Sequence, residues 1–210
     1  IGLPHNMGSS SAFPVDSLRS ATFTKKYGTA PSVMDYARFN YVAQPEDKGV
    51  VLMPSQWDSP NVGIYDKFSV MWGYKPILDV TEDEEKDILK KWIIEKEDDL
   101  MYRFGPSGGI DPSSQTEDLG DNAIKASSYG IKNLKRIVPN LMEWTTKDGE
   151  NYDELEYMYS QVLNQFRRYM GHVTTNIGGV YQYYKTSDQD GAVYTHVDKN
   201  HQKECLKFLN

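Results

Sequence analysis

The change in sequence pattern at Thr81 limits most strongly what this chain can fold into. Residues 1 to 80 are rich in Gly, Pro, Ser and aromatic residues and show no strong helical period, which predicts loops with short strands or helical turns. After Thr81, apolar residues recur at helical spacing. The sequence therefore predicts an α+β fold with two domains: an irregular N-terminal third over 1–80, and a mainly helical subdomain with a β-hairpin over 81–210.

Three residue pairs in the second part fit the helix-start pattern of a polar residue followed three positions later by Glu: Thr81–Glu84, Ser114–Glu117 and Asn151–Glu154. In this pattern the two side chains bond the free backbone amides of the first helical turn. The pairs predict one helix over residues 82–103, a second that Pro139 stops or kinks, and a third that ends near residue 176. The acidic run 82–85 then belongs to a first helical turn, where negative charge is favourable, and is not a calcium site.

The end of the chain has the pattern of a hairpin followed by a helix. Segments 180–185 and 192–197 flank the polar segment 187–191, which predicts two strands joined by a five-residue loop. Asp198 is placed to cap a last helix that runs through Leu209.

Charge and composition exclude several classes of protein. The net charge is −7, and the sequence has no basic stripe of the kind that binds nucleic-acid phosphates. The single cysteine, Cys205, allows no intrachain disulfide. No apolar run approaches the roughly 18 residues of a membrane helix. We therefore expect no nucleic-acid partner and no membrane-spanning segment.

Two short segments in the irregular part carry the strongest functional signal. The first is Ile1-Gly2-Leu3-Pro4-His5, and the second is Ser32-Val33-Met34-Asp35-Tyr36. Together they resemble the metzincin metallopeptidases, whose motif H-E-x-x-H-x-x-G-x-x-H is followed by a turn that contains Met. Residues 1–5 match the final x-G-x-x-H of that motif, so its first two histidines and its glutamate would precede Ile1.

The resemblance implies a role for each matching residue. His5 would be the third protein ligand of a zinc ion, and Gly2 would allow the sharp turn that brings it there. Met34 would lie in the Met-turn beneath the metal and support the histidines. Tyr36 would act in catalysis near the metal, either as a ligand of the resting ion or as a hydrogen-bond donor to the developing oxyanion. The implied reaction is hydrolysis of a peptide or protein substrate by a zinc-activated water.

Further segments resemble the region after the Met-turn in a group of large bacterial metzincin-like proteins: Gly63–Asp66, Met71–Tyr74, Asp111–Pro112, Gln115–Asp121, Asn133–Ile137 and Arg168–His172. By this resemblance, residues 1–80 are the C-terminal part of a catalytic domain, with the third zinc ligand, the Met-turn and cleft loops. The resemblance also implies an exported protein, located in the periplasm, the cell envelope or outside the cell. The chain would depend on the remaining N-terminal catalytic domain of a parent protein. Because one imidazole holds zinc poorly, we expect the 210-residue chain alone to bind no zinc and to be inactive.

The alternative hypothesis is a non-catalytic binding or structural module of a larger envelope protein, with a degenerate metal site. An upstream His-Glu-x-x-His would distinguish the two hypotheses. The sequence leaves open whether Asp16, Asp35 and Asp66 line a cleft. His172, near the end of the third helix, is interpreted as a charge that complements the helix dipole rather than as a metal ligand.

Overall fold

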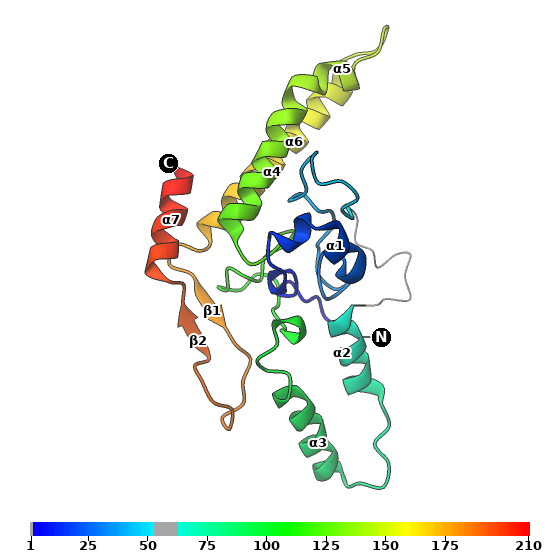
Figure 1. The fold of residues 1–210 in the computed structure, drawn as a ribbon, viewed down its shortest axis with the longest axis vertical. Helices are drawn as coiled ribbons and strands as arrows, with labels where there is room; N and C mark the ends of the chain where they lie inside the picture. The colour runs from blue at the N-terminus through cyan, green and yellow to red at the C-terminus, as the bar shows by residue number, and fades with distance from the viewer. Residues whose placement is uncertain (1, 53–62) are drawn as a thin grey trace.

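The computed structural model describes residues 2–52 and 63–210, and it has the α+β architecture that the sequence predicts. Its elements in chain order are η1 (Ser10–Ala12), η2 (Ser17–Arg19), α1 (Ala21–Tyr27), α2 (Ile64–Tyr74), α3 (Glu82–Ile94), η4 (Leu100–Tyr102), α4 (Ala123–Ile137), η5 (Val138–Asn140), α5 (Leu141–Thr145), α6 (Asp153–Thr174), β1 (Val180–Gln182), β2 (Tyr194–His196) and α7 (Lys199–Leu209). The N-terminal loops and α1 form the body of the molecule, from which α4, α5 and α6 extend in one direction and α2 and α3 in the other (Figure 1). No helix of the described residues is long and apolar enough to cross a membrane.

The main core joins the body to α4 and α6. Phe13 and Val42 from the body belong to the same buried cluster as Leu134 and Tyr169 from the two helices. A Cβ at Gly130 would lie 2.5 Å from the ring of Tyr169, so α4 approaches that ring closely only because position 130 has no side chain. The core therefore contains residues from both sides of Thr81, and the domain boundary there stays a prediction.

Helix α3 begins where the sequence predicts and ends earlier. Thr81 and Glu84 form the complete capping box. The helix stops at Ile94 instead of continuing to residue 103, and a turn then leads into η4. No residue of α3 is buried, and segment 95–99 is polar throughout, so no core contact favours a longer helix there.

The predicted helix start at Ser114 is wrong. The backbone at Glu117 has φ 63°, in the left-handed region, and α4 begins only at Ala123. Its N-cap is Asn122, whose side chain accepts a hydrogen bond from the amide of Lys125. The Glu117 carboxylate instead contacts arginines from other parts of the chain, so a long-range ion pair replaces the local cap.

The later elements are placed largely as predicted. Pro139 lies in η5, a 3-10 turn between α4 and α5. Helix α6 starts at Asp153 with Tyr152 as its N-cap and no side-chain cap, so Asn151 and Glu154 do not form the predicted capping pair. Strands β1 and β2 pair antiparallel with Val180 opposite His196, although each strand has three residues and the loop between them is longer than predicted. Asp198 caps α7 as expected.

Helix α2 corrects the prediction of loops, short strands or helical turns over residues 1–80. It follows Gly63, where a Cβ would lie 1.9 Å from the carbonyl oxygen of Pro31. Only glycine permits this approach, and it brings the start of α2 against the segment that contains Met34.

Candidate metal centre

His5 and Tyr36 lie side by side, although they are 31 positions apart in the sequence. Their ring centroids are 4.8 Å apart with an edge-on arrangement. The amide of Asn6 donates a 3.0 Å hydrogen bond to the carbonyl of Met34. Gly2 has φ 81°, a conformation that favours glycine, as the expected turn requires. The structure thus brings together the four residues that the sequence singled out, with His5 and Tyr36 exposed.

Asn6 fixes the segment that contains His5. It is fully buried, and its side-chain amide donates to the carbonyl of Arg103 at 2.9 Å. Its side-chain oxygen accepts from the amide of Gly105 at 2.8 Å. Together with the Asn6–Met34 bond, these contacts hold the segment between the Met-turn and the chain that follows η4. The sequence analysis did not identify this role, and its only local signal is that Asn6 directly follows His5.

Asp66, in the first turn of α2, holds the Met-turn from the other side. The Ser32 hydroxyl donates to one carboxylate oxygen at 2.5 Å, and the amide of Val33 donates to the other at 2.8 Å. The Ser32 hydroxyl in turn accepts from the amide of Met34 at 3.0 Å. Asp66 is 2% exposed, so it supports the turn from within the protein and does not line a cleft.

Asp35 is also buried and forms part of a second polar network. The amide of Ser10 donates to one of its oxygens at 2.6 Å, and the other oxygen has no partner among the described residues. Burial raises the pKa of Asp35 to about 8. The Ser10 hydroxyl reaches Asp118 at 3.5 Å, and burial, together with the charge of Asp35, raises the pKa of Asp118 well above its ordinary value. Two carboxyl groups so placed retain a proton near neutral pH.

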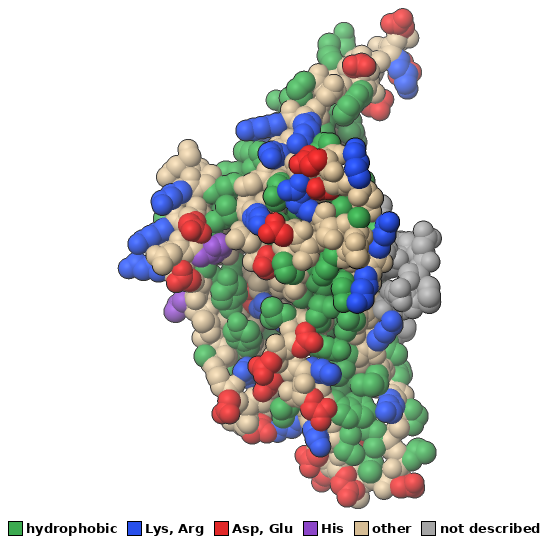
Figure 2. All heavy atoms as spheres, viewed as in Figure 1, with side chains coloured by type: hydrophobic (Ala, Val, Ile, Leu, Met, Phe, Trp, Pro, Cys, Tyr) green, Lys and Arg blue, Asp and Glu red, His purple; other side chains and the backbone are tan. Residues whose placement is uncertain are grey.

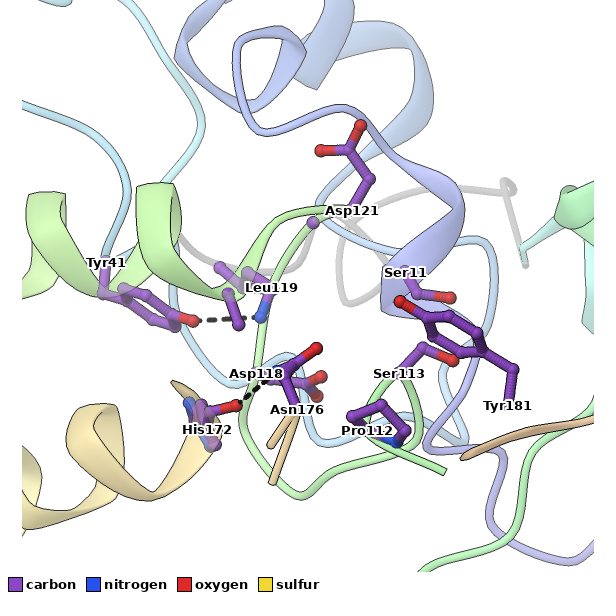
Figure 3. Close-up of a pocket in the computed structure, with 12 residues that line it drawn as sticks. Ser11, Tyr41, Pro112, Ser113, Asp118, Leu119, Asp121, His172, Asn176 and Tyr181 are labelled. Atoms are coloured by element: carbon purple, nitrogen blue, oxygen red, sulfur yellow. Dashed lines mark hydrogen bonds between the residues drawn. The ribbon is translucent and has the colours of Figure 1, made fainter. Parts of the chain in front are cut away.

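A small polar cavity of about 30 Å³ adjoins this network, with Asp118, His172 and Asn176 in its wall (Figure 3). The Nε2–H of His172 donates to the Thr116 carbonyl at 3.0 Å, and its Nδ1 has no partner among the described residues. Burial lowers the pKa of His172 to about 4. The ring is therefore neutral at pH 7, and the interpretation of His172 as a positive charge on the helix dipole is wrong. A polar cavity of this size holds about one water molecule.

A much larger apolar groove opens beside His5. Its volume is about 570 Å³, and Leu3 and Pro4, the residues directly before His5, form part of its wall. Seven aromatic side chains from α2, the η4 region and the hairpin region line the rest: Tyr65, Phe68, Trp72, Tyr102, Phe104, Tyr183 and Tyr184. The groove has the apolar lining typical of a binding site, and no single motif in the sequence indicated it.

The donor groups present fit one side of a zinc site. His5 offers an imidazole and Tyr36 a phenol, both of which are metal ligands in proteins. Among residues 2–52 and 63–210, no group of three or more His, Cys, Asp or Glu side chains is close enough together to hold a metal ion. Asp16 is exposed and pairs with Lys125, so it does not join the site.

Comparison with known proteins gives one result that covers the whole chain. A family model described as Met-zincin matches residues 1–210. No curated protein and no solved structure matches the chain. The family match spans both the segment with His5 and the helical part, so it does not depend on the short motifs alone. The chain belongs to the Met-zincin family.

Proposed function

We propose that this protein is part of a zinc-dependent peptidase in which His5 is a metal ligand and Tyr36 acts beside it. The observation that carries the proposal is the contact between these two rings, together with the Asn6–Met34 hydrogen bond that joins their segments. Membership of the Met-zincin family also supports a zinc-dependent peptidase. Zinc, when bound, supplies a Lewis acid that polarises the peptide carbonyl and activates water for its hydrolysis.

The residues of this chain have two tasks in the proposed site. Asn6 and Asp66 hold the His5 segment and the Met-turn in fixed positions through buried hydrogen bonds. Tyr36 is 36% exposed beside His5, so its hydroxyl is available to donate a hydrogen bond to an oxyanion on the substrate. A rigid support of this kind keeps the reacting groups aligned.

The substrate in this proposal is a peptide or protein. The aromatic groove starts at Leu3 and Pro4, so a peptide whose scissile bond lies at His5 can place an adjacent apolar side chain in it. Lys96, Glu97 and Gln182 at the groove offer hydrogen bonds to the peptide backbone or to polar side chains.

The proposal includes a source for the remaining ligands. In this proposal, residues 1–5 are the final x-G-x-x-H of the motif, and a parent protein supplies its two histidines and its general-base glutamate. Export to the cell envelope or beyond stays a prediction.

The test measures zinc content and peptide hydrolysis in the parent protein. His5→Ala removes one of three protein ligands, so most of the zinc should be lost, while His196→Ala, a change of an exposed strand residue, should leave it in place. Tyr36→Phe should keep the zinc and lower kcat by about 100-fold, the usual effect of removing one oxyanion donor. Unchanged zinc content in His5→Ala would exclude His5 as a ligand. If the parent protein has no His-Glu-x-x-His motif and does not hydrolyse peptides, the alternative hypothesis of a non-catalytic module is favoured instead.

A further inference from the structure

Helices α4, α5 and α6 form an arm that stands out from the body (Figure 1). The arm comprises residues 123–174, and its two long helices run antiparallel with the Ser127 hydroxyl bonded to the carbonyl of Tyr169. Helix α6 has 22 residues and is therefore about 33 Å long. The arm offers a large surface that the candidate metal centre does not use.

One side of the arm exposes an apolar stripe. Tyr159, Leu163 and Phe166 follow helical spacing on α6 and are 47%, 37% and 41% exposed. Arg168, which pairs with Glu117, lies about 200° around the helix from Phe166, so the stripe is on a different side of α6 from this ion pair. Val138 and Met142, four positions apart at the end of α4 and in α5, are exposed as well. Several exposed apolar side chains in a row along a helix are typical of an interaction site.

The charges of the arm are separated by sign along its length. We call residues 143–156 the tip and residues 123–137 with 157–174 the lower section. The lower section has six basic residues and no Asp or Glu: Lys125, Lys132, Lys135, Arg136, Arg167 and Arg168. The tip has six acidic residues and one lysine: Glu143, Asp148, Glu150, Asp153, Glu154 and Glu156, with Lys147. Figure 2 shows acidic side chains at the tip and basic side chains below them.

Most of this charge is not neutralised within the chain. Of the basic residues, Lys125 pairs with Asp16 and Arg168 with Glu117. Within the part of the chain that the structure describes, no carboxylate pairs with Lys132, Lys135 or Arg167. At the tip, the single lysine pairs with Glu150 and leaves the other acidic side chains without a lysine or arginine partner among the described residues.

We propose that two copies of this chain associate through their arms in antiparallel orientation, with the tip of each against the lower section of the other. A two-fold axis across the arm brings acidic and basic sections together twice and pairs the apolar stripes between them. A parallel arrangement would place like charges together. A nucleic acid or an anionic membrane would be attracted by the lower section and repelled by the tip, whereas a second copy satisfies both sections.

The first test is the mass of the 210-residue chain in solution by sedimentation equilibrium. At about 0.02 M salt, where exposed charges are weakly screened, we expect a dimer; at about 0.5 M salt the dissociation constant should rise by at least about tenfold. A chain that stays monomeric at about 100 μM in low salt contradicts the proposal, since such an interface would be too weak to matter.

A charge exchange makes the test specific for the antiparallel orientation. Lys132→Glu with Lys135→Glu lowers the net charge of the lower section from +6 (six basic residues) to +2 (four basic, two acidic), and Glu143→Lys with Glu156→Lys changes that of the tip from −5 (six acidic, one basic) to −1 (four acidic, three basic). All four side chains are exposed, so circular dichroism should show an unchanged fold. Each double variant alone should dimerise more weakly than the unchanged chain, because both of its contacts are weakened. An equal mixture of the two should dimerise more tightly than either alone, because one contact of the mixed dimer joins an unchanged tip to an unchanged lower section.

The control reverses two charges outside the arm, Glu82→Lys with Asp83→Lys on α3, and should dimerise like the unchanged chain. The proposal is overturned if either double variant still dimerises as the unchanged chain does, or if their mixture dimerises no more tightly than each variant alone. Binding of the unchanged chain to anionic vesicles without dimerisation would also overturn it, in favour of a membrane surface.

Discussion

The Met-turn region and the helical region of this protein are stabilised in different ways. The segments with His5 and Met34 are irregular, and buried side chains from distant parts of the chain fix them: Asn6 bonds to Arg103 and Gly105, and Asp66 bonds to the Met-turn. Helices α3, α4 and α7 start at local caps, in which a side chain bonds an amide two or three residues away. The comparison indicates that polar contacts between distant residues determine the geometry of the candidate site, whereas local sequence determines the helices.

The largest effect should come from the buried carboxylate of the first region. Asp66→Ala removes the acceptor of the Ser32 hydroxyl and the Val33 amide, and hydrogen bonds to a charged group are worth more than neutral ones. We expect a loss of about 3 kcal/mol in the free energy of unfolding, measured with urea. Asp153→Ala changes an exposed acidic residue in the first turn of α6. It should lower the free energy of unfolding by less than about 1 kcal/mol. Equal losses would show that Asp66 acts only through the helix dipole.

The second prediction concerns the packing of α4 against α6. Gly130→Ala places a Cβ 2.5 Å from the ring of Tyr169, which is 2% exposed and has no room to move. Overpacking of this kind should cost about 2 kcal/mol. Gly171→Ala, in α6, meets no atom of the described residues within 4 Å and should stabilise the protein by about 0.5 kcal/mol through helix propensity. If both changes stabilise, the close approach at Gly130 is not present in solution.

The sequence predicts the helices that start at local contacts better than the segments that are fixed by contacts between distant residues. Capping residues Thr81 and Asp198 predict α3 and α7 because the contacts that start those helices are local. The pair Ser114–Glu117 fits the same pattern and fails, because Glu117 contacts Arg38 and Arg168, which no local pattern reveals.

At the candidate site, the resemblance to metzincins identified His5, Met34 and Tyr36, and the structure places His5 beside Tyr36. Their roles as ligand, support and catalytic residue stay predictions. The supporting residues Asn6 and Asp66 were not predicted, since their partners lie far away in the sequence: 97 residues for the Asn6–Arg103 bond and 34 for the Asp66–Ser32 bond.

The buried carboxyl pair gives a prediction about pH. Burial raises the pKa of Asp35 from 3.8 to about 8, so the folded protein retains a proton that the unfolded chain releases. The contribution of this proton to the stability of the folded protein is complete below the unfolded pKa of 3.8, and it is lost as pH rises through the folded pKa of about 8. His172 has the opposite effect, because its pKa falls from 6.5 to about 4, but that effect is constant above pH 6.5. Stability should therefore fall between pH 6.5 and 8, by at most about 1.4 kcal/mol per pH unit for one proton.

Asp35→Asn isolates this effect, since it keeps a side-chain oxygen for the Ser10 amide but cannot ionise. Urea unfolding of Asp35→Asn should show a flatter dependence on pH above 6.5 than the unchanged chain. Asp16→Asn, a change of an exposed carboxylate, should leave the slope as it is. A slope that is the same in all three proteins would mean that Asp35 is ionised in the folded state.

The smallest effect belongs to a local contact of the helical region. Asn122→Ala removes the side chain that caps α4 at the amide of Lys125, and the loss of a cap costs about 1 kcal/mol. Asn200→Ala, in the first turn of α7, changes an exposed asparagine that is not a cap and should have no effect beyond about 0.5 kcal/mol. The urea midpoints of Asn122→Ala and the unchanged chain also test where α4 begins. If the helix started at Ser114, Asn122 would lie in its interior, where Ala is the better helix former, and Asn122→Ala would stabilise the protein instead.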